Sequence, residues 1–210
     1  MTWAALAVLS AYLIGSLSGS LLLGRLIGVD IRTRGSGNAG GTNALRTVGW
    51  RFALAVVAID VGKGALAAGL PWLLPEAAGI ETLELGYACA LAAAIGHTWP
   101  LFHGFRGGKG AGTLAGALLV VWPVVVPALL AVWLITLAAS GYVGLATVAA
   151  AVALPLAAWL LPGADAARAG FAGGAAVLLV FTHRHNLVRL VRGTEYRFER
   201  ARLLRWRGRE

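Results

Sequence analysis

The stretch FALAVVAIDVGKGALAAGLPWLL occupies residues 52–74 and decides which kind of fold this chain can adopt. Apart from Asp60 and Lys63, its residues are all apolar or small. A helix needs about 20 mostly apolar residues to cross a bilayer, and this stretch is long enough. The two charges stand three positions apart, so they share one helix face and can pair inside a bundle. Two interpretations remain open: an internal ion pair that locks neighbouring helices together, or a direct contact with a substrate.

Similar apolar stretches recur along the 210 residues, of which 59% are hydrophobic and 13% charged. Soluble domains carry about 25% charged residues. We therefore predict an all-α, polytopic integral membrane helical bundle that forms a single domain over residues 1–210. The predicted spans include residues 3–23, 52–74, 85–101 and 169–181. Small residues inside the first of them should let helices pack closely.

The region 113–161 determines the number of spans. Its 49 residues are too many for one helix of about 20 residues and few for three. Pro123 and Pro127 should break a helix near Trp122, and residues 140–142 offer a second break. We predict three passes here, with the first two short, and therefore seven transmembrane helices; a single pass would give five.

The distribution of basic residues predicts the orientation. Arginine and lysine gather in the loops 25–51 and 103–112 and in the segment from residue 184 onward, which also forms a basic tail from about residue 197. Basic loops mark the cytoplasmic side, so the connections 75–84 and 162–165 should lie outside. The N-terminus is then outside and the C-terminus cytoplasmic. Because the net charge of +9 is confined to loops, we expect no nucleic-acid partner.

The loop that follows the first span contains RGSGNAGGTNALR at residues 34–46. Glycines allow backbone N–H groups to turn inward, and successive inward N–H groups form a concavity that binds anions. Hydroxyl, amide and guanidinium groups add further donors, from Ser36, Asn38, Thr42, Asn43, Arg34 and Arg46. The pattern predicts a phosphate site, and the alternative is an ordinary loop between helices.

Two later segments carry similar chemistry. GGKGAGT at residues 107–113 combines glycines, Lys109 and a helix N-terminus, which attracts anions. Taken alone, this segment also fits a hinge with a cytoplasmic lysine. THRHNLVRL at residues 182–190 adds imidazole, amide and guanidinium groups. His97, close to the inner end of the third span, fits a structural hydrogen bond or a catalytic role.

In order and spacing, these segments resemble the acyl-phosphate-dependent glycerol-3-phosphate acyltransferases of bacteria, the PlsY type. The resemblance covers nearly the whole chain. It is carried by Gly35-Ser36-Gly37-Asn38-x-Gly40-x-Thr42-Asn43-x-x-Arg46, by Asp60-x-x-Lys63-Gly64, by Gly96-His97-x-x-Pro100-x-Phe102-x-x-Phe105-x-Gly107-Gly108-Lys109-Gly110, and by His183-Arg184-x-Asn186-Leu187-x-Arg189-Leu190-x-x-Gly193-x-Glu195. The chain departs from the family pattern at Gly41, Trp99, Gly112, Gly144 and Thr147.

This resemblance implies an enzyme that transfers a fatty acyl group from acyl phosphate to the 1-hydroxyl of sn-glycerol 3-phosphate. The products would be lysophosphatidic acid and phosphate, in the first step of bacterial phospholipid synthesis. It also implies seven spans in the bacterial cytoplasmic (inner) membrane and an active site that faces the cytoplasm. The expected partners are acyl phosphate, glycerol 3-phosphate and the bilayer, with no cofactor, no metal and no obligate protein partner.

The resemblance, read together with the residue chemistry, gives a hypothesis for the site. The catalytic residues would be Ser36, Lys109, His183 and Asn186. The substrate-binding residues would be Gly37, Asn38, Gly40, Thr42, Asn43, Arg46, Asp60, Lys63, His97, Gly108, Thr147, Arg189 and Glu195. His183 would orient or deprotonate the acceptor hydroxyl, unless the phosphate of the donor takes the proton. Because acyl phosphate is already activated, positioning and charge stabilisation can suffice.

Two rival functions fit the sequence less well. A phosphatidyl-group transferase of the CDP-alcohol type needs several aspartates on one face for paired metals, but only Asp60 lies in the inner half of a span. A membrane transporter of a phosphorylated metabolite would suit the broken helices, but it should show two related halves. We find no internal repeat in the sequence.

Overall fold

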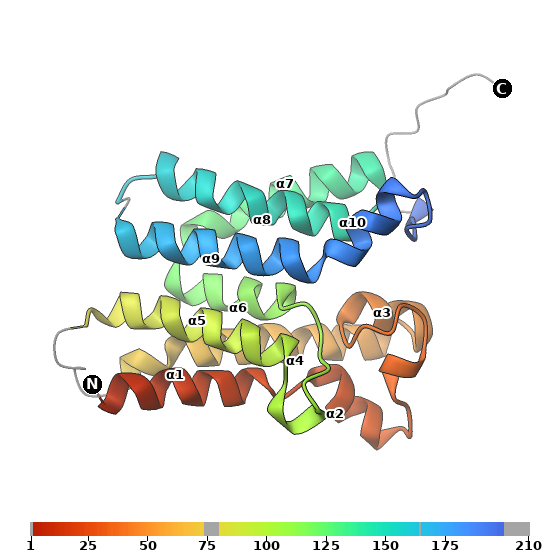
Figure 1. Ribbon diagram of the computed structural model, residues 1–210, viewed down its shortest axis with the longest axis horizontal. Helices are drawn as coiled ribbons and strands as arrows, with labels where there is room; N and C mark the ends of the chain where they lie inside the picture. The colour runs from red at the N-terminus through yellow and green to blue at the C-terminus, as the bar shows by residue number, and fades with distance from the viewer. Residues whose placement is uncertain (1, 74–79, 164, 200–210) are drawn as a thin grey trace. The chain divides into compact units, whose positions relative to one another are not determined.

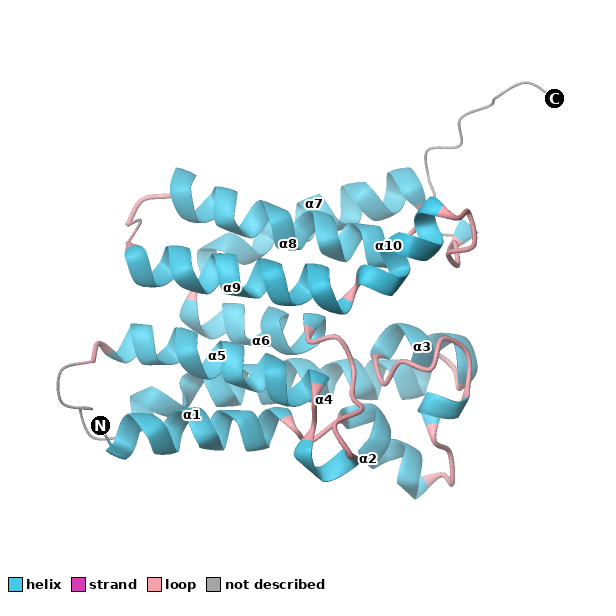
Figure 2. Cartoon of the chain, in the orientation of Figure 1, coloured by secondary structure: helices cyan, strands magenta, loops and turns pink. Residues whose placement is uncertain are grey.

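The computed structural model describes residues 2–73, 80–163 and 165–199, and every regular element in these ranges is a helix (Figure 2). The chain packs as two compact units, Met1–Pro123 and Val124–Glu210. The single membrane-embedded domain remains a prediction. Parts of four predicted segments lie outside the described residues: position 74 of the span 52–74, positions 75–79, position 164, and positions 200–210 of the basic tail.

Unit 1 contains six α-helices and three short 3-10 helices within the described residues (Figure 1). In chain order they are α1 (Thr2–Gly15), α2 (Gly19–Leu26), η1 (Ile31–Thr33), α3 (Gly41–Thr47), α4 (Trp50–Gly69), η2 (Leu70–Leu73), α5 (Thr82–Thr98), η3 (Leu101–His103) and α6 (Ala111–Val121). The loop predicted over residues 25–51 therefore contains two helices, η1 and α3.

Unit 2 begins inside the 3-10 helix η4 (Pro123–Val125), which crosses the boundary between the units. It contains α7 (Val126–Ser140), α8 (Val143–Leu160), α9 (Ala166–Thr182) and α10 (Arg184–Val191). Helix α8 packs against α7 on one side and α9 on another.

Four helices in the described residues are long and apolar enough to cross a membrane: Trp50–Leu73, Thr82–His103, Pro123–Ser140 and Val143–Leu160. Two bent pairs raise the number to six if each pair counts as one span. These are Trp3–Gly15 with Gly19–Leu26, bent by 44°, and Ala166–Thr182 with Arg184–Val191, bent by 53°. Helix α6 is apolar but shorter, with 11 residues. The all-α membrane fold is confirmed, whereas the seven spans and the orientation remain predictions.

The region 113–161 forms three helices, α6, α7 and α8, with breaks at the two predicted places. The first break falls at Trp122 and Pro123. The second falls at Gly141, which has a left-handed φ of +79° and ends α7. Pro127 does not break a helix, because it lies in the first turn of α7, where a missing N–H has no cost.

The first predicted span is not one continuous helix. It ends at Gly15 and resumes at Gly19, and the small residues on both sides bring backbones together. A Cβ at Gly15 would collide with the backbone of Ala93, and one at Gly96 would collide with the backbone of Tyr12. Close packing by small residues is thus confirmed for α1 against α5, and the break was not predicted.

Glycines also bring α6 close to α4. A Cβ at Gly64 would collide with the backbone of Thr113, and one at Gly116 would collide with that of Val61. The start of α6 is therefore held beside the middle of α4, where a Cβ at Gly112 would lie 3.5 Å from the Cβ of Asp60. This packing places the segment that carries Lys109 near the buried charges of α4.

Candidate active site

The side chain of Asn43 organises the first glycine-rich segment in unit 1. Its amide nitrogen donates to the carbonyls of Ile31 (3.1 Å) and Arg34 (3.0 Å), and its oxygen accepts the N–H of Ser36 (3.0 Å). Asn43 is 1% exposed. Both amide protons thus hold the loop in shape, whereas the sequence analysis expected them at a phosphate.

Two glycines give this loop the left-handed backbone that the sequence predicted. Gly35 has φ +57° and Gly37 has φ +72°, a region that costs glycine little. Ser36, which stands between them, is exposed. Further along, Asn38, Gly40, Thr42 and Arg46 are partly buried. Ser36 therefore lies on the exposed side of the turn, and the buried Asn43 side chain holds the backbone of the turn in place.

The second glycine-rich segment lies directly against the first. The space that a Cβ would occupy at Gly108 is filled by the His97 ring and by the Ala39 carbonyl, which would be 3.0 Å away. The N–H groups of Gly107 and Gly108 donate to the carbonyls of Thr98 and His97, both at 3.1 Å. Two of the three segments singled out from the sequence thus meet within unit 1.

Lys109 follows this contact and is partly buried. The next residue, Gly110, has φ +87° and is the N-cap of α6. Lys109 is therefore fixed on both sides, by the packing of Gly108 against His97 and by the start of a helix. Gly107 and Gly108 are needed here for close approach to the end of α5.

Asp60 and Lys63 form the predicted ion pair, with 3.1 Å between Lys63 Nζ and Asp60 Oδ1. His97 joins them, with its Nδ1 2.8 Å from Lys63 Nζ. Their side chains are only 4–6% exposed. The structure therefore brings together three residues that the sequence analysis assigned to substrate binding.

These three side chains also satisfy the backbone at the break between α1 and α2. Lys63 Nζ donates to the carbonyl of Leu17 (2.9 Å), and Asp60 Oδ1 accepts the N–H of Gly19 (3.3 Å). A broken helix leaves such groups without internal partners, which is costly at membrane depth. The three ammonium protons of Lys63 match three acceptors: Leu17 O, Asp60 Oδ1 and His97 Nδ1. Of the two interpretations drawn from the sequence, the geometry favours the internal ion pair.

In unit 2, His183 lies at the corner between α9 and α10. Its Nδ1 is 2.8 Å from the carbonyl of Leu179. A carbonyl can only accept a hydrogen bond, so Nδ1 carries the proton and Nε2 of the neutral ring is an acceptor. This tautomer suits the role predicted for His183, which is to orient a hydroxyl or take its proton.

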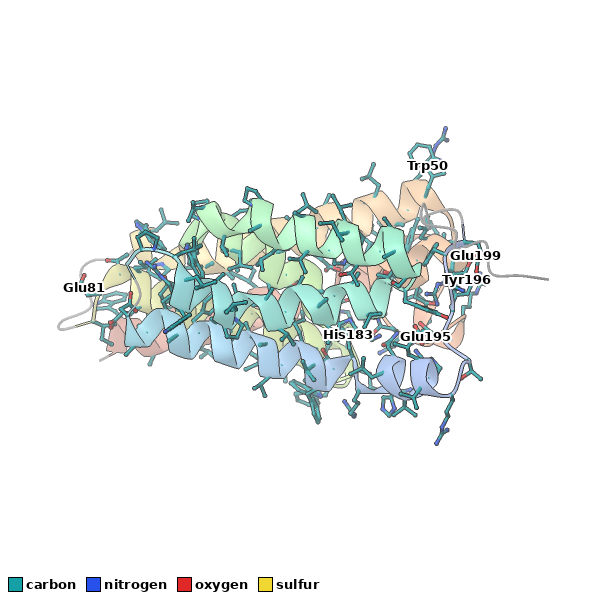
Figure 3. All side chains as sticks on the ribbon, turned by 90° about the horizontal axis from the view of Figure 1, so that it is seen from above. Trp50, Glu81, His183, Glu195, Tyr196 and Glu199 are labelled. Carbon is teal, nitrogen blue, oxygen red and sulfur yellow. The ribbon has the colours of Figure 1, made fainter. Side chains whose placement is uncertain are left out.

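Asn186 and Arg189 share Glu195 as their partner. Asn186 Nδ2 donates to one carboxylate oxygen and Arg189 Nε to the other, both at 2.7 Å. Figure 3 labels His183 and Glu195, which come from this corner and from the segment after α10. The Glu195 side chain is 4% exposed, so both of its oxygens serve these two residues rather than solvent.

Gly193 explains the spacing of this third motif. It has φ +68°, its N–H bonds to the Leu190 carbonyl (3.0 Å), and the Thr194 N–H bonds to the Arg189 carbonyl (2.8 Å). These two bonds form a Schellman turn, which ends a helix and reverses the chain. The reversal returns Glu195 to Asn186 and Arg189.

Gly144 and Thr147 are two of the positions at which the chain departs from the pattern of the family that it resembles. A Cβ at Gly144 would lie 3.0 Å from the Asn186 side chain, so this glycine makes room for it. The Thr147 hydroxyl donates to the Val143 carbonyl (2.9 Å) and accepts from Trp133 Nε1 (3.2 Å). Both of these bonds connect residues within α7 and α8.

The sequence analysis missed Asp30 and Arg32 as residues that support the site. Arg32 binds Asp30 and reaches two carbonyls of the second glycine-rich loop. The signal was present as an Asp-x-Arg spacing directly before the first glycine-rich segment.

Known proteins share this fold. The profile of the glycerol-3-phosphate acyltransferase family matches residues 5–193. The glycerol-3-phosphate acyltransferase of Chlorobaculum tepidum is 37% identical, over 96% of this chain and 99% of its own length. That of Pseudomonas aeruginosa PAO1 is 44% identical, over 94% of this chain and 100% of its own length.

Two crystal structures of PlsY, an integral membrane glycerol 3-phosphate acyltransferase, are also similar. The glycerol 3-phosphate form has a TM-score of 0.85 at 34% identity and covers 93% of this chain and 95% of its own. The form with lysophosphatidic acid has a TM-score of 0.84 at 32% identity and covers 95% and 97%. Fold and site together define a multi-pass membrane acyltransferase. The chain belongs to the glycerol-3-phosphate acyltransferase family of the PlsY type.

Glu195→Gln is expected to lower kcat/KM for glycerol 3-phosphate by roughly tenfold or more. The substitution keeps the size of the side chain but replaces a charged acceptor, and hydrogen bonds to charged groups contribute about 1.5–3 kcal/mol. Steady-state kinetics of the purified enzyme in detergent would measure the effect. Glu199→Gln is the matched control, because Glu199 is 62% exposed and its nearest cationic partner, Arg197, is 3.6 Å away. Equal activity of the two variants would contradict a role for Glu195 in holding Asn186.

Proposed function

We propose that this enzyme transfers a fatty acyl group from acyl phosphate to the 1-hydroxyl of sn-glycerol 3-phosphate. The products are lysophosphatidic acid and inorganic phosphate, and the reaction opens phospholipid synthesis at the cytoplasmic face of a bacterial inner membrane. Family membership supports this assignment, and so do the two solved forms of PlsY, which correspond to the acceptor and the acylated product.

The observation that carries the proposal is the contact of the two glycine-rich segments at Ala39 and Gly108 in unit 1. Both substrates bear a phosphate, so the site needs donors and positive charge concentrated in one place. The exposed turn at Ser36 and the partly buried Arg46 belong to the first of these segments, and the partly buried Lys109 belongs to the second. Charged donors of this kind bind phosphate oxygens through short, strong hydrogen bonds.

The predicted residues have two proposed roles, support of the site and contact with the substrates; Asn186 and Arg189, in the second group, also bond to Glu195. Asn43, Asp60, Lys63, Thr147 and Glu195 support the site, because their polar atoms bond to the protein. Ser36, Asn38, Lys109, Arg46 and the backbone between them hold phosphate. For unit 2 we propose that Asn186 and Arg189 bind substrate and that His183 Nε2 accepts the proton of the attacking hydroxyl or orients that hydroxyl.

The reaction then needs little covalent help from the protein. The hydroxyl oxygen of glycerol 3-phosphate attacks the acyl carbonyl carbon, and a new ester bond forms. The bond between that carbon and the bridging phosphate oxygen breaks, and phosphate leaves with the electron pair. The proton of the hydroxyl goes to His183 or to a phosphate oxygen. Positive groups placed beforehand stabilise the oxyanion that develops on the carbonyl.

A direct assay tests this function. Purified enzyme given palmitoyl phosphate and glycerol 3-phosphate, with a chelator and no added metal, should release lysophosphatidic acid and phosphate in equal amounts. Mass spectrometry would quantify the lipid, and a colorimetric assay would quantify the phosphate. Turnover with a CDP-alcohol substrate, or uptake of glycerol 3-phosphate into proteoliposomes without acylation, would support one of the rivals instead.

A further inference from the structure

The loop that leads to Lys109 contains a turn with an unusual backbone. Gly104 has φ +64° and ψ +34°, and Phe105, which follows it, has φ +58°. Phe105 is the one residue other than glycine with a positive φ in the described parts of the chain. A left-handed backbone is strained for a bulky side chain and persists only when its surroundings enforce it. Phe105 is 54% exposed, so burial of this residue does not enforce the conformation.

Arg32 bonds to the carbonyls on both sides of this turn. Its Nη1 donates to the carbonyl of His103 (3.0 Å), before the two left-handed residues, and to that of Arg106 (3.3 Å), after them. The Phe105 N–H also donates to the Pro100 carbonyl (3.0 Å). One planar guanidinium therefore joins the two ends of the turn.

Asp30 fixes the other edge of the same guanidinium. Arg32 Nε lies 3.0 and 3.2 Å from the two carboxylate oxygens, and Nη2 lies 2.8 Å from Oδ2. Asp30 Oδ1 also accepts the backbone N–H of Arg32 (2.9 Å). The hydrogen bonds from Arg32 lower the pKa of Asp30 from 3.8 to about 2, so the carboxylate remains charged at any pH used for an assay.

We propose that Arg32, oriented by Asp30, is a positioning residue that holds the Gly104–Phe105 turn closed and thereby fixes the place of Lys109. The path from the turn to Lys109 is short. Directly after Arg106, the N–H groups of Gly107 and Gly108 bond to the end of α5, and Lys109 follows. This inference rests on the phosphate-holding role proposed for Lys109.

A lysine cannot replace Arg32 in this arrangement. The contacts to Asp30 and to two carbonyls require donors in a fixed planar fork, whereas an ammonium group is a point charge on a flexible stem. The requirement distinguishes this inference from a general need for positive charge near the loop. Position 105 offers a second test, because a residue there that tolerates the left-handed region would need less support from Arg32.

The experiment compares Arg32→Ala, Arg32→Lys and the double variant Arg32→Ala/Phe105→Asn with wild type. Kinetics at varied glycerol 3-phosphate and acyl phosphate would separate KM from kcat, and thermal unfolding in detergent would report the fold. Both single variants should lose roughly 10- to 100-fold in kcat/KM, as expected when a catalytic group is misplaced. Phe105→Asn should recover a substantial part of that loss. Arg51→Ala is the control, since Arg51 is exposed at the start of α4, with its guanidinium 5.4 Å from the Trp50 ring.

Wild-type activity in Arg32→Lys would overturn the inference, because charge alone would then suffice. The absence of recovery in the double variant would also overturn it, because the strained turn would not be what Arg32 supports. If Arg32→Ala does not fold, Arg32→Lys with and without Phe105→Asn gives the same comparison. The role of Lys109 is tested separately by Lys109→Ala. An active Lys109→Ala would refute the proposed site, whereas an inactive Lys109→Ala beside an active Arg32→Ala would refute only the positioning role.

Discussion

Lys109→Ala is expected to lower turnover by roughly 100-fold or more and to leave the thermal unfolding temperature nearly unchanged. Lys109 is partly buried at the N-terminal end of α6, in the segment that packs against Ala39. Loss of a group that stabilises charge in the transition state typically costs 10²–10³ in kcat. The local fold should survive, because the contacts at Gly107, Gly108 and Gly110 involve their backbones.

The test is steady-state turnover of purified Lys109→Ala, with unfolding followed by tryptophan fluorescence. Lys109→Arg serves as the matched variant and should retain part of the activity, since it keeps the charge but changes the geometry. Near-normal turnover in Lys109→Ala would remove Lys109 from the site. A large drop in unfolding temperature would instead assign Lys109 to stability.

Asp60→Asn should cause the largest loss of folded protein among single substitutions in unit 1. The change keeps the shape but leaves the Lys63 ammonium without its countercharge, next to the break between α1 and α2. Removing one partner of a buried ion pair typically costs about 3–5 kcal/mol. A charge that remains unpaired at the bilayer centre costs at least about 2.5–3.5 kcal/mol. The measurement is the yield of monodisperse protein in detergent together with its unfolding temperature.

The double variant Asp60→Asn/Lys63→Met separates support from substrate binding. It removes the unpaired charge, so part of the lost stability should return, and the folded enzyme should keep a KM for glycerol 3-phosphate close to that of wild type. A recovered fold with a greatly raised KM would mean that the pair binds substrate directly. This outcome would favour direct contact with the substrate, the alternative that the internal hydrogen bonds of Asp60 and Lys63 disfavour.

Features encoded locally could be predicted from the sequence. The three-residue spacing of Asp60 and Lys63 indicated their pairing, and Pro123 and Gly141 marked two helix ends. The break at residues 16–18 was missed because it contains no proline. The break is stabilised by a residue far along the chain, because Lys63 Nζ donates to the Leu17 carbonyl, 46 positions away. A contact of that kind depends on how helices pack, which residue spacing does not reveal.

In the candidate site, too, locally encoded features were predicted from the sequence, whereas features that depend on the path of the chain were not. Left-handed backbone was expected for the glycines of the first segment, because no other residue adopts that conformation so readily; Gly35 and Gly37 have it, whereas Gly40 has φ −128°. Asn43 was assigned to phosphate because an amide donates equally well to an anion or to a carbonyl. Only the path of the loop decides which, and that path brings the Ile31 and Arg34 carbonyls to it. The contact of Glu195 with Asn186 likewise depends on the Schellman turn at Gly193, and a single glycine in the sequence is not enough to predict that turn.

The network of bonds around Asn43 also bears on the thermodynamics of ligand capture. A mobile loop must give up conformational freedom when it closes on an anion, and that loss subtracts from affinity. Here three bonds from one buried amide have already ordered the backbone at residues 31–36. A phosphate bound at the site we propose would therefore meet backbone that is already ordered, and its association should carry only a small entropic penalty from the protein.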